Sequence, residues 1–361
     1  MTNEELQSKT IDFLRFPLIV GVVLIHAHIT GMTIKGNDVL RGNSFPVCDT
    51  ISYFFSEVVA RMAVPLFFFI SGFLFFYKIR GFSLSVYATK LKGRIRSILI
   101  PYLFWNLVVI LFFFLAQTFL PGLMSGANKL IRDYSYTDWL AAFWSVGGEG
   151  GYPICYQFWF LRDLMVVMLF SPLLYMTVKY FRWSGVFVLG VLWYFNWWFS
   201  LVGFSITAFF FFSAGACFSV LHCNFVTLFK SYLFPLSVAY ALSVFICVWF
   251  REKFWIDYVS PLAILAGIAF VISLSARFLE RGKWSVTTFL VGGTFFVYAF
   301  HGMPLAFIQK FVIKHIPTLT DALLLSIYFL SAGFIILLSL GIYYFLKRWF
   351  PRFLSIITGG R

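Results

Sequence analysis

Residues 11–30 read IDFLRFPLIVGVVLIHAHIT, and this stretch decides how the rest of the chain is interpreted. It is almost wholly apolar and as long as the roughly twenty residues that a helix needs to cross the hydrocarbon core of a bilayer. Arg15 and His26 interrupt it, at a spacing of about three helical turns, or about 16 Å along the axis. Both side chains should therefore share one face of a membrane-spanning helix over residues 11–31, with Arg15 near the inner surface and His26 in the outer half.

Apolar runs of this length recur along the chain with short polar breaks between them. The predicted spans are 11–31, 53–77, 98–120, 156–178, 184–199, 203–221, 231–250, 259–276, 287–309 and 320–346. Hydrophobic residues make up 61% of the chain and charged residues 12%, against about 45–50% and about 25% in soluble domains. The runs are continuous, which is typical of helices and not of the alternating strands of a membrane barrel. We predict an all-α integral membrane protein, a polytopic bundle of about ten transmembrane helices that forms a single domain over residues 1–361.

The formal net charge of +14 would indicate a nucleic-acid partner in a soluble protein. In a membrane protein it indicates basic cytoplasmic loops beside anionic lipid headgroups, so no nucleic acid is predicted. With both termini inside, the inner segments hold seventeen of the 28 Lys and Arg residues and the outer segments hold eight, which favours cytoplasmic termini. The first ten residues are polar and no cleavable signal peptide is evident, so the first apolar run is predicted to be retained.

Three arginines lie within predicted spans: Arg15, Arg61 and Arg162. A charge inside the membrane costs about 3 kcal/mol or more and is a functional candidate by default. Snorkelling from a helix end is the alternative, and Arg15 is close enough to an end for it. Glu57, one turn before Arg61, is a possible ion-pair partner. Asp163 either orients a histidine or pairs with an arginine.

Residues 90–97 read KLKGRIRS and form a predicted cationic loop at the inner surface, ahead of the third span. Lys92, Arg94 and Arg96 in this loop are suited to binding phosphates, and an arginine can do so with two parallel hydrogen bonds. The alternative is that they only anchor the topology.

Small and polar residues elsewhere give further candidates. Ser71-Gly72 in the second span permits close helix approach. His301 lies in the middle of the ninth span, where it either lines a cavity or bonds to a neighbouring helix. The outer loop carries GGEGG at 147–151, with Glu149 as a binding candidate. The five cysteines show no CxxC or Cys/His metal spacing, so no metal is predicted.

Four further motifs follow the first span in a fixed order. They are RMAVPLFFFISGFL at 61–74, KLKGRIRSILIPYLFW at 90–105, QFWFLRDLM at 157–165 and FFVYAFHGMPL at 295–305. With the Arg15 and His26 pair, their order and spacing resemble the acyltransferase 3 family of bacterial membrane proteins, over residues 11–305.

The resemblance implies transfer of an acyl group, commonly acetyl from acetyl-CoA, to a hydroxyl of a glycan or related envelope molecule at the bacterial cytoplasmic membrane. It implies that His26 is the general base, that Arg15 is the basic residue of the first span, and that Arg94 and its neighbours contact the acyl donor. The sequence departs from the family at Ser97, where a second basic residue is common, and Arg96 lies one place earlier.

The expected site residues fall into three groups. They are the catalytic His26, Arg15 and Arg61; the donor-binding Arg94, Arg96, Lys92 and Ser71; and the acceptor-binding Arg162, Asp163, His301 and Glu149.

A transporter or flippase for lipid-linked saccharides would share the span count and the buried arginines. It would not need a histidine together with an inner basic segment, and no inverted repeat is visible in the sequence. A membrane sensor, or an inactive relative of the acyltransferases, is a further alternative.

Overall fold

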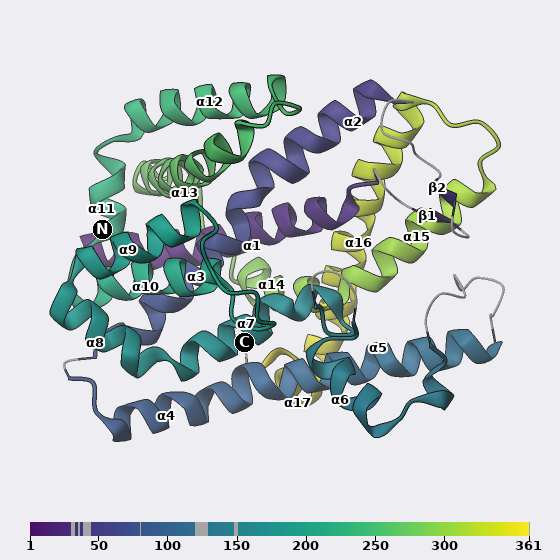
Figure 1. Cartoon of the computed structure of the whole chain (residues 1–361), viewed down its shortest axis with the longest axis horizontal. Coiled ribbons are helices and arrows are strands. Elements are labelled where there is room, and N and C mark those ends of the chain that lie inside the picture. Colours follow the sequence, from purple (N-terminus) through teal and green to yellow (C-terminus); the bar gives the residue numbers. More distant parts are fainter. Residues whose placement is uncertain are drawn as a thin grey trace. The chain divides into compact units, whose positions relative to one another are not determined.

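The computed structural model describes residues 1–29, 33–34, 37–38, 45–79, 81–119, 129–147 and 151–360 (Figure 1). Within these residues the protein is helical apart from a pair of two-residue antiparallel strands, which confirms the predicted all-α class. The elements, in which η marks π or 3-10 helices, are α1 (Asn3–Ala27), β1 (Thr33–Ile34), β2 (Asn37–Asp38), α2 (Pro46–Tyr53), η1 (Phe54–Val59), η2 (Ala60–Met62), α3 (Ala63–Phe76), α4 (Leu84–Arg94), η3 (Ile95–Leu99), α5 (Ile100–Phe119), η5 (Ile131–Asp133), α6 (Tyr136–Trp144), η6 (Tyr156–Phe158), α7 (Trp159–Leu169), α8 (Ser171–Phe181), α9 (Trp183–Tyr194), α10 (Ile206–Val220), α11 (Phe225–Lys230), α12 (Leu233–Trp249), α13 (Ile256–Glu280), α14 (Thr288–Phe300), α15 (Gly302–His315), α16 (Asp321–Trp349) and α17 (Pro351–Thr358).

An apolar helix lies in each predicted span, and several are long enough to cross a membrane. Continuous helices of sufficient length cover Asn3–Ala27, Pro46–Phe76, Leu84–Phe119, Ile256–Glu280 and Asp321–Trp349. Two further pairs, α7 with α8 and α14 with α15, qualify when each bent pair is taken as one span. The described part of the chain thus holds five to seven helices able to cross by length and composition, as expected for a multi-pass membrane protein.

Two predicted spans are broken by sharp bends. The angle is 62° between α7 and α8 and 61° between α14 and α15. Pro172 lies in the first turn of α8 and Pro304 in the first turn of α15, where the missing N–H is tolerated and a new helix readily begins. Apolar composition sets the length of a span but not the direction of its axis, so the sequence predicted the runs and not these bends.

The predicted cationic loop at 90–97 is wrong as a loop. Helix α4, the π-helical turn η3 and helix α5 run on as one helical segment from Leu84 to Phe119. Lys, Leu, Arg and Ile are acceptable helix formers, and Gly93 alone did not break the helix.

Contacts divide the chain into two compact units, which are described separately. The first comprises residues 1–25, 53–91 and 166–294, and the second comprises 26–52, 92–165 and 295–361.

In the first unit, helices α3 and α10 pack closely. A Cβ on Gly72 would collide with the backbone of Phe212, and one on Gly215 would collide with the backbone of Phe69. Small residues let membrane helices approach to this distance. The prediction that Ser71-Gly72 permits close packing is confirmed at Gly72.

In the second unit, α5 packs against α17 and against residues 129–147 of the predicted outer loop, which we call the outer segment. Ile110, Ile131 and Ala142 form a small apolar core. The hydrogen bond from Lys129 holds the pKa of Asp138 low, at about 2, in the capping box of α6. All five cysteines of the chain are free thiols, so Cys48 and Cys155, which fall in two loops predicted to lie outside, do not form a disulfide in this structure.

Candidate active site

His301 lies at the break between α14 and α15 and is fully buried, with 0% exposure. Its Nδ1 lies 2.8 Å from the carbonyl oxygen of Tyr298 and 3.2 Å from that of Val297. A carbonyl oxygen only accepts hydrogen bonds, so Nδ1 carries the proton of the neutral ring and Nε2 keeps its lone pair. Among the described residues, Nε2 has no hydrogen-bond partner. The backbone thus fixes the tautomer of a buried ring whose Nε2 is available to accept a proton or a hydrogen bond.

His26, near the end of α1, lies against His301. The ring centroids are 5.3 Å apart and the rings are tilted by 36°. Tyr156 meets the ring of His26 edge-on, with centroids 5.0 Å apart. His26 is only partly buried, so the cluster combines a buried histidine with a more accessible one. The structure brings together two predicted site residues from opposite ends of the sequence.

Gln157 places a second acceptor beside the same bend. Its Nε2 donates to the carbonyl of Ala299 at 3.1 Å, and its own backbone carbonyl accepts from the Tyr298 hydroxyl at 2.6 Å. Because Nε2 faces a carbonyl, Oε1 must point the other way, and it has no partner among the described residues. The amide lies so close to Gly302 that any Cβ there would collide with it.

Two buried acceptors, His301 Nε2 and Gln157 Oε1, therefore flank one helix break, and neither has a donor in the described part of the chain. Leaving a buried polar group unsatisfied costs about 1–3 kcal/mol. Such groups are stable in a binding site, where a ligand supplies the missing donors. A hydroxyl-rich ligand has the matching chemistry.

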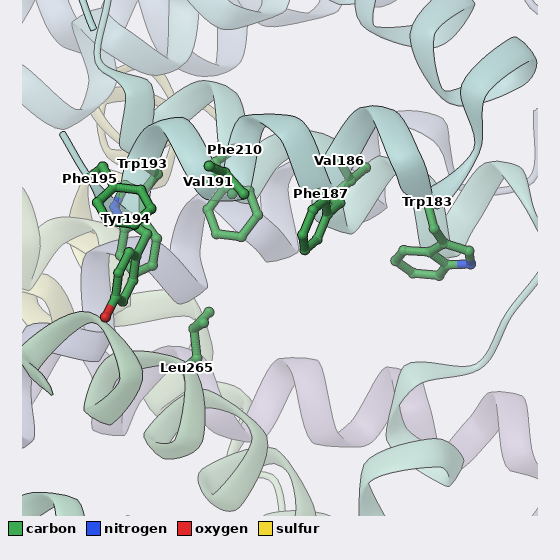
Figure 2. A pocket seen from close by; sticks show the side chains of 10 residues that line it. Trp183, Val186, Phe187, Val191, Trp193, Tyr194, Phe195, Phe210 and Leu265 are labelled. Atoms are coloured by element: carbon green, nitrogen blue, oxygen red, sulfur yellow. The ribbon is translucent and has the colours of Figure 1, made fainter. Parts of the chain in front are cut away.

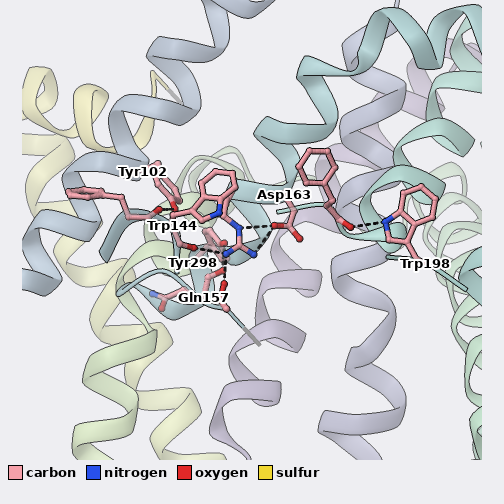
Figure 3. Close-up of polar contacts among 10 residues, drawn as sticks. Tyr102, Trp144, Gln157, Asp163, Trp198 and Tyr298 are labelled. Carbon is pink, nitrogen blue, oxygen red and sulfur yellow. Dashed lines mark hydrogen bonds and ion pairs between the residues drawn. The ribbon is translucent and has the colours of Figure 1, made fainter. Parts of the chain in front are cut away.

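The predicted pair of Arg162 and Asp163 is buried, with each residue 3% exposed, and its contacts are drawn in Figure 3. Nε and Nη2 of Arg162 both reach Asp163 Oδ1 at 2.9 Å. Nη1 donates to the carbonyls of Trp144 and Gly151, and the guanidinium lies 5.6 Å from the centroid of the Trp144 ring. These contacts tie the backbone at Trp144 and Gly151 to α7, which favours a positioning role for Arg162. Its predicted contact with an acceptor stays a prediction.

An aromatic stack supports the histidine cluster. Phe158 stacks between Tyr102, at 5.7 Å, and Tyr298, at 5.5 Å. Tyr102 donates its hydroxyl to the carbonyl of Phe143, which fixes one end of the stack (Figure 3). Tyr298 in turn supplies the carbonyl that orients His301. The stack therefore restrains the backbone on which the tautomer depends.

The remaining predicted catalytic residues belong to the first unit. Arg15 pairs with Asp12 at 3.1 Å, and both are partly exposed. Arg61 pairs with Glu57, as predicted, through Nε at 2.7 Å and through Nη2. The cooperation of Arg15 and Arg61 with His26, and the predicted donor contact of Ser71, stay predictions.

The predicted donor-binding cations lie at the junction of α4 and η3. Lys92 and Arg96 are exposed, and Arg94 is half-buried. Guanidinium and ammonium groups fit the phosphates of coenzyme A. Glu149, the last predicted residue, lies outside the described residues.

A separate groove of about 450 Å³ lies in the first unit (Figure 2). Trp183, Phe187, Trp193 and Phe210 line it almost entirely with apolar surface. The hydroxyl of its one tyrosine, Tyr194, donates to the carbonyl of Tyr258 at 3.0 Å. No histidine or carboxylate is among the residues that line this groove.

Sequence reasoning missed Gln157, Tyr156 and Gly302. Gln157 opens a motif that was quoted for its arginine and aspartate, and an amide in an apolar run is itself a signal. Its role follows from its contact with the α14–α15 break, which only the tertiary structure reveals.

Comparison with known proteins identifies the family of the chain. The family profile described as an acyltransferase domain, acyltransferase 3, matches residues 8–349. The chain is 26% identical over 376 residues to the succinoglycan biosynthesis protein ExoH of Rhizobium meliloti (strain 1021), covering 98% of this chain and 92% of the relative. No solved structure matches the chain. The protein is an acyltransferase that belongs to the acyltransferase 3 family.

Proposed function

We propose that the protein transfers an acyl group, acetyl in the first instance, from cytoplasmic acyl-CoA to a hydroxyl of a cell-envelope glycan, with His26 as general base. The observation that carries this proposal is the cluster at the α14–α15 break. There, His26 lies against His301, and two buried acceptors have no donor among the described residues. A glycan acceptor is further supported by the relative named for succinoglycan biosynthesis.

In the proposed reaction, each group of the cluster has a defined role. His26 takes the proton of the acceptor hydroxyl while the hydroxyl oxygen attacks the thioester carbonyl carbon. His301 Nε2 and Gln157 Oε1 accept hydrogen bonds from the acceptor and orient it; a sugar presents neighbouring hydroxyls to two such acceptors. The carbon–sulfur bond then breaks, the ester forms, and the coenzyme A thiolate takes up the proton that His26 releases.

The developing oxyanion needs a donor or a positive charge. Tyr156 meets the ring of His26 edge-on, and its hydroxyl is only loosely engaged, 3.4 Å from the carbonyl of Gly302. We assign the stabilisation to Tyr156, with Arg61 and Arg15 as the predicted charges.

We also propose ten membrane crossings with both termini in the cytoplasm, in the bacterial cytoplasmic membrane. The excess of Lys and Arg in the inner segments supports this topology. It brings the cationic segment to the side where acyl-CoA is available.

The test is transfer of radiolabelled acetyl from acetyl-CoA by the purified protein in detergent, with hydrolysis of the donor measured in parallel. His26→Ala is expected to lower the rate at least about 100-fold, as loss of a general base does. His315→Ala replaces an exposed histidine of α15 and is the matched control, expected to retain the wild-type rate.

Full activity of His26→Ala would contradict the proposed role of His26 as general base. No donor turnover and no donor binding by well-folded wild type, together with movement of unmodified lipid-linked saccharide, would favour a transporter instead. Succinyl-CoA in place of acetyl-CoA tests the identity of the acyl group.

A further inference from the structure

The short C-terminal helix α17 is fastened to the start of α5 in the second unit. Leu354 and Ile357 are buried, and Figure 1 shows the helix beside α5. The indole Nε1 of Trp105 donates to the carbonyl of Ile357 at 3.0 Å, and the rings of Phe104 and Phe353 meet edge-on at 5.7 Å. A hydrogen bond and ring packing thus hold α17 on α5.

Two glycines follow the end of helix α17, and they differ in one respect. Gly359 has φ +72° and Gly360 has φ +77°, both in the left-handed region that favours glycine. A Cβ on Gly359 would collide with the carbonyl oxygen, carbonyl carbon and Cα of Ser97. A Cβ on Gly360 would meet only Ser355 Oγ, at 3.9 Å. Only Gly359 combines the backbone requirement with direct contact on another segment.

The segment contacted by Gly359 is the π-helical turn η3. Ser97 follows Arg96 directly and lies three residues after Arg94. Turns of this kind inside α-helices are frequent at functional sites, because they offset the direction of the side chains around them. The Ser97 hydroxyl is buried without a hydrogen-bond partner among the described residues. In addition to the backbone hydrogen bonds of the helix itself, the packing of Gly359 on the Ser97 backbone therefore restrains this turn from another segment.

We infer that Gly359 and α17 position Arg94 and Arg96 for the phosphates of the acyl donor, a role that rests on the proposed function above. Arginine binds phosphate through a planar fork whose two hydrogen bonds need a defined orientation. A shift of η3 would misalign both guanidinium groups without touching the histidine cluster. Gly359 is a positioning residue, and its effect should appear in donor binding alone.

The test compares Gly359→Ala with Gly360→Ala in the full-length protein. Both substitutions place an alanine at a positive φ, but only Gly359→Ala drives a Cβ into Ser97. We expect Gly359→Ala to raise KM and Kd for acetyl-CoA about ten-fold, the loss of about one charge-assisted hydrogen bond. Its kcat and the KM for the glycan acceptor should stay at the values of Gly360→Ala.

Equal donor KM and Kd in the two variants, or a fall in kcat at unchanged donor KM, would overturn the inference. Trp105→Phe provides a second variant if Gly359→Ala does not fold. It keeps an aromatic ring and removes the hydrogen bond to Ile357, and its donor Kd should rise while its kcat stays constant. Absence of acetyl-CoA binding by the wild type would instead count against the proposed function itself.

Discussion

At the scale of single residues, the site depends on which atoms remain unpaired. The sequence identified His26, His301 and Arg162 because polar groups in apolar runs are conspicuous. It could not show that Arg162 is engaged by its neighbours while no described residue donates to His301 Nε2. That distinction depends on carbonyl groups of the outer segment and of α14, whose positions follow from folding and not from local sequence.

The unpaired Oε1 of Gln157 gives a prediction at this scale. Gln157→Leu removes the acceptor at similar volume, so the KM for the glycan acceptor should rise about ten-fold or more, the effect of about 1.4 kcal/mol of lost binding. The KM for acetyl-CoA should not change. Gln117→Leu, which removes a glutamine that bonds to the backbone of Lys129 and Ile131 on the outer segment, is the control. An unchanged acceptor KM in Gln157→Leu would exclude contact between Oε1 and the acceptor.

At the scale of elements, the bend between α14 and α15 creates the site. The sequence predicted one span at 287–309, and the structure breaks it at His301 with an angle of 61°. Gly302 allows the amide of Gln157 to lie directly on the new helix. Hydrophobic periodicity carries no information about such a contact, which explains why the run could be predicted and its geometry could not.

Gly302→Ala tests the importance of this contact. The added methyl group would collide with an amide that its hydrogen bond to Ala299 restrains, so Gln157 must move out of position. We expect kcat/KM for the acceptor to fall at least about ten-fold, in line with displacement of a substrate-positioning group. Gly333→Ala in α16 is the matched control, since no described atom beyond the neighbouring backbone of α16 lies within 4 Å of its Cβ, and its activity should equal that of wild type. Equal activities of both variants would contradict the prediction.

At the scale of the whole molecule, the sequence predicted where the apolar helices lie better than which of them cross the membrane. Every predicted span contains a helix, but α9 has only 12 residues. It is about 18 Å long, short of the hydrocarbon core of about 30 Å. The predicted span 184–199 runs past the end of α9 because the residues after Tyr194 are mostly aromatic and apolar as well. Whether this segment crosses the membrane therefore decides between ten and eight crossings.

Thiol labelling in spheroplasts distinguishes a crossing by α9 from a re-entrant hairpin of α9 and α10. Cys223 is the one exposed native cysteine, and the predicted topology places it inside, so a membrane-impermeant maleimide should label it only after permeabilisation. In a Cys223→Ser background, Leu201→Cys introduces an exposed thiol in the connection between α9 and α10. If α9 crosses, this thiol lies outside and reacts in intact spheroplasts. Labelling of Leu201→Cys only after permeabilisation would place both ends of the α9–α10 hairpin and its tip on the inner side. The number of crossings would then fall by two, and the termini would remain cytoplasmic.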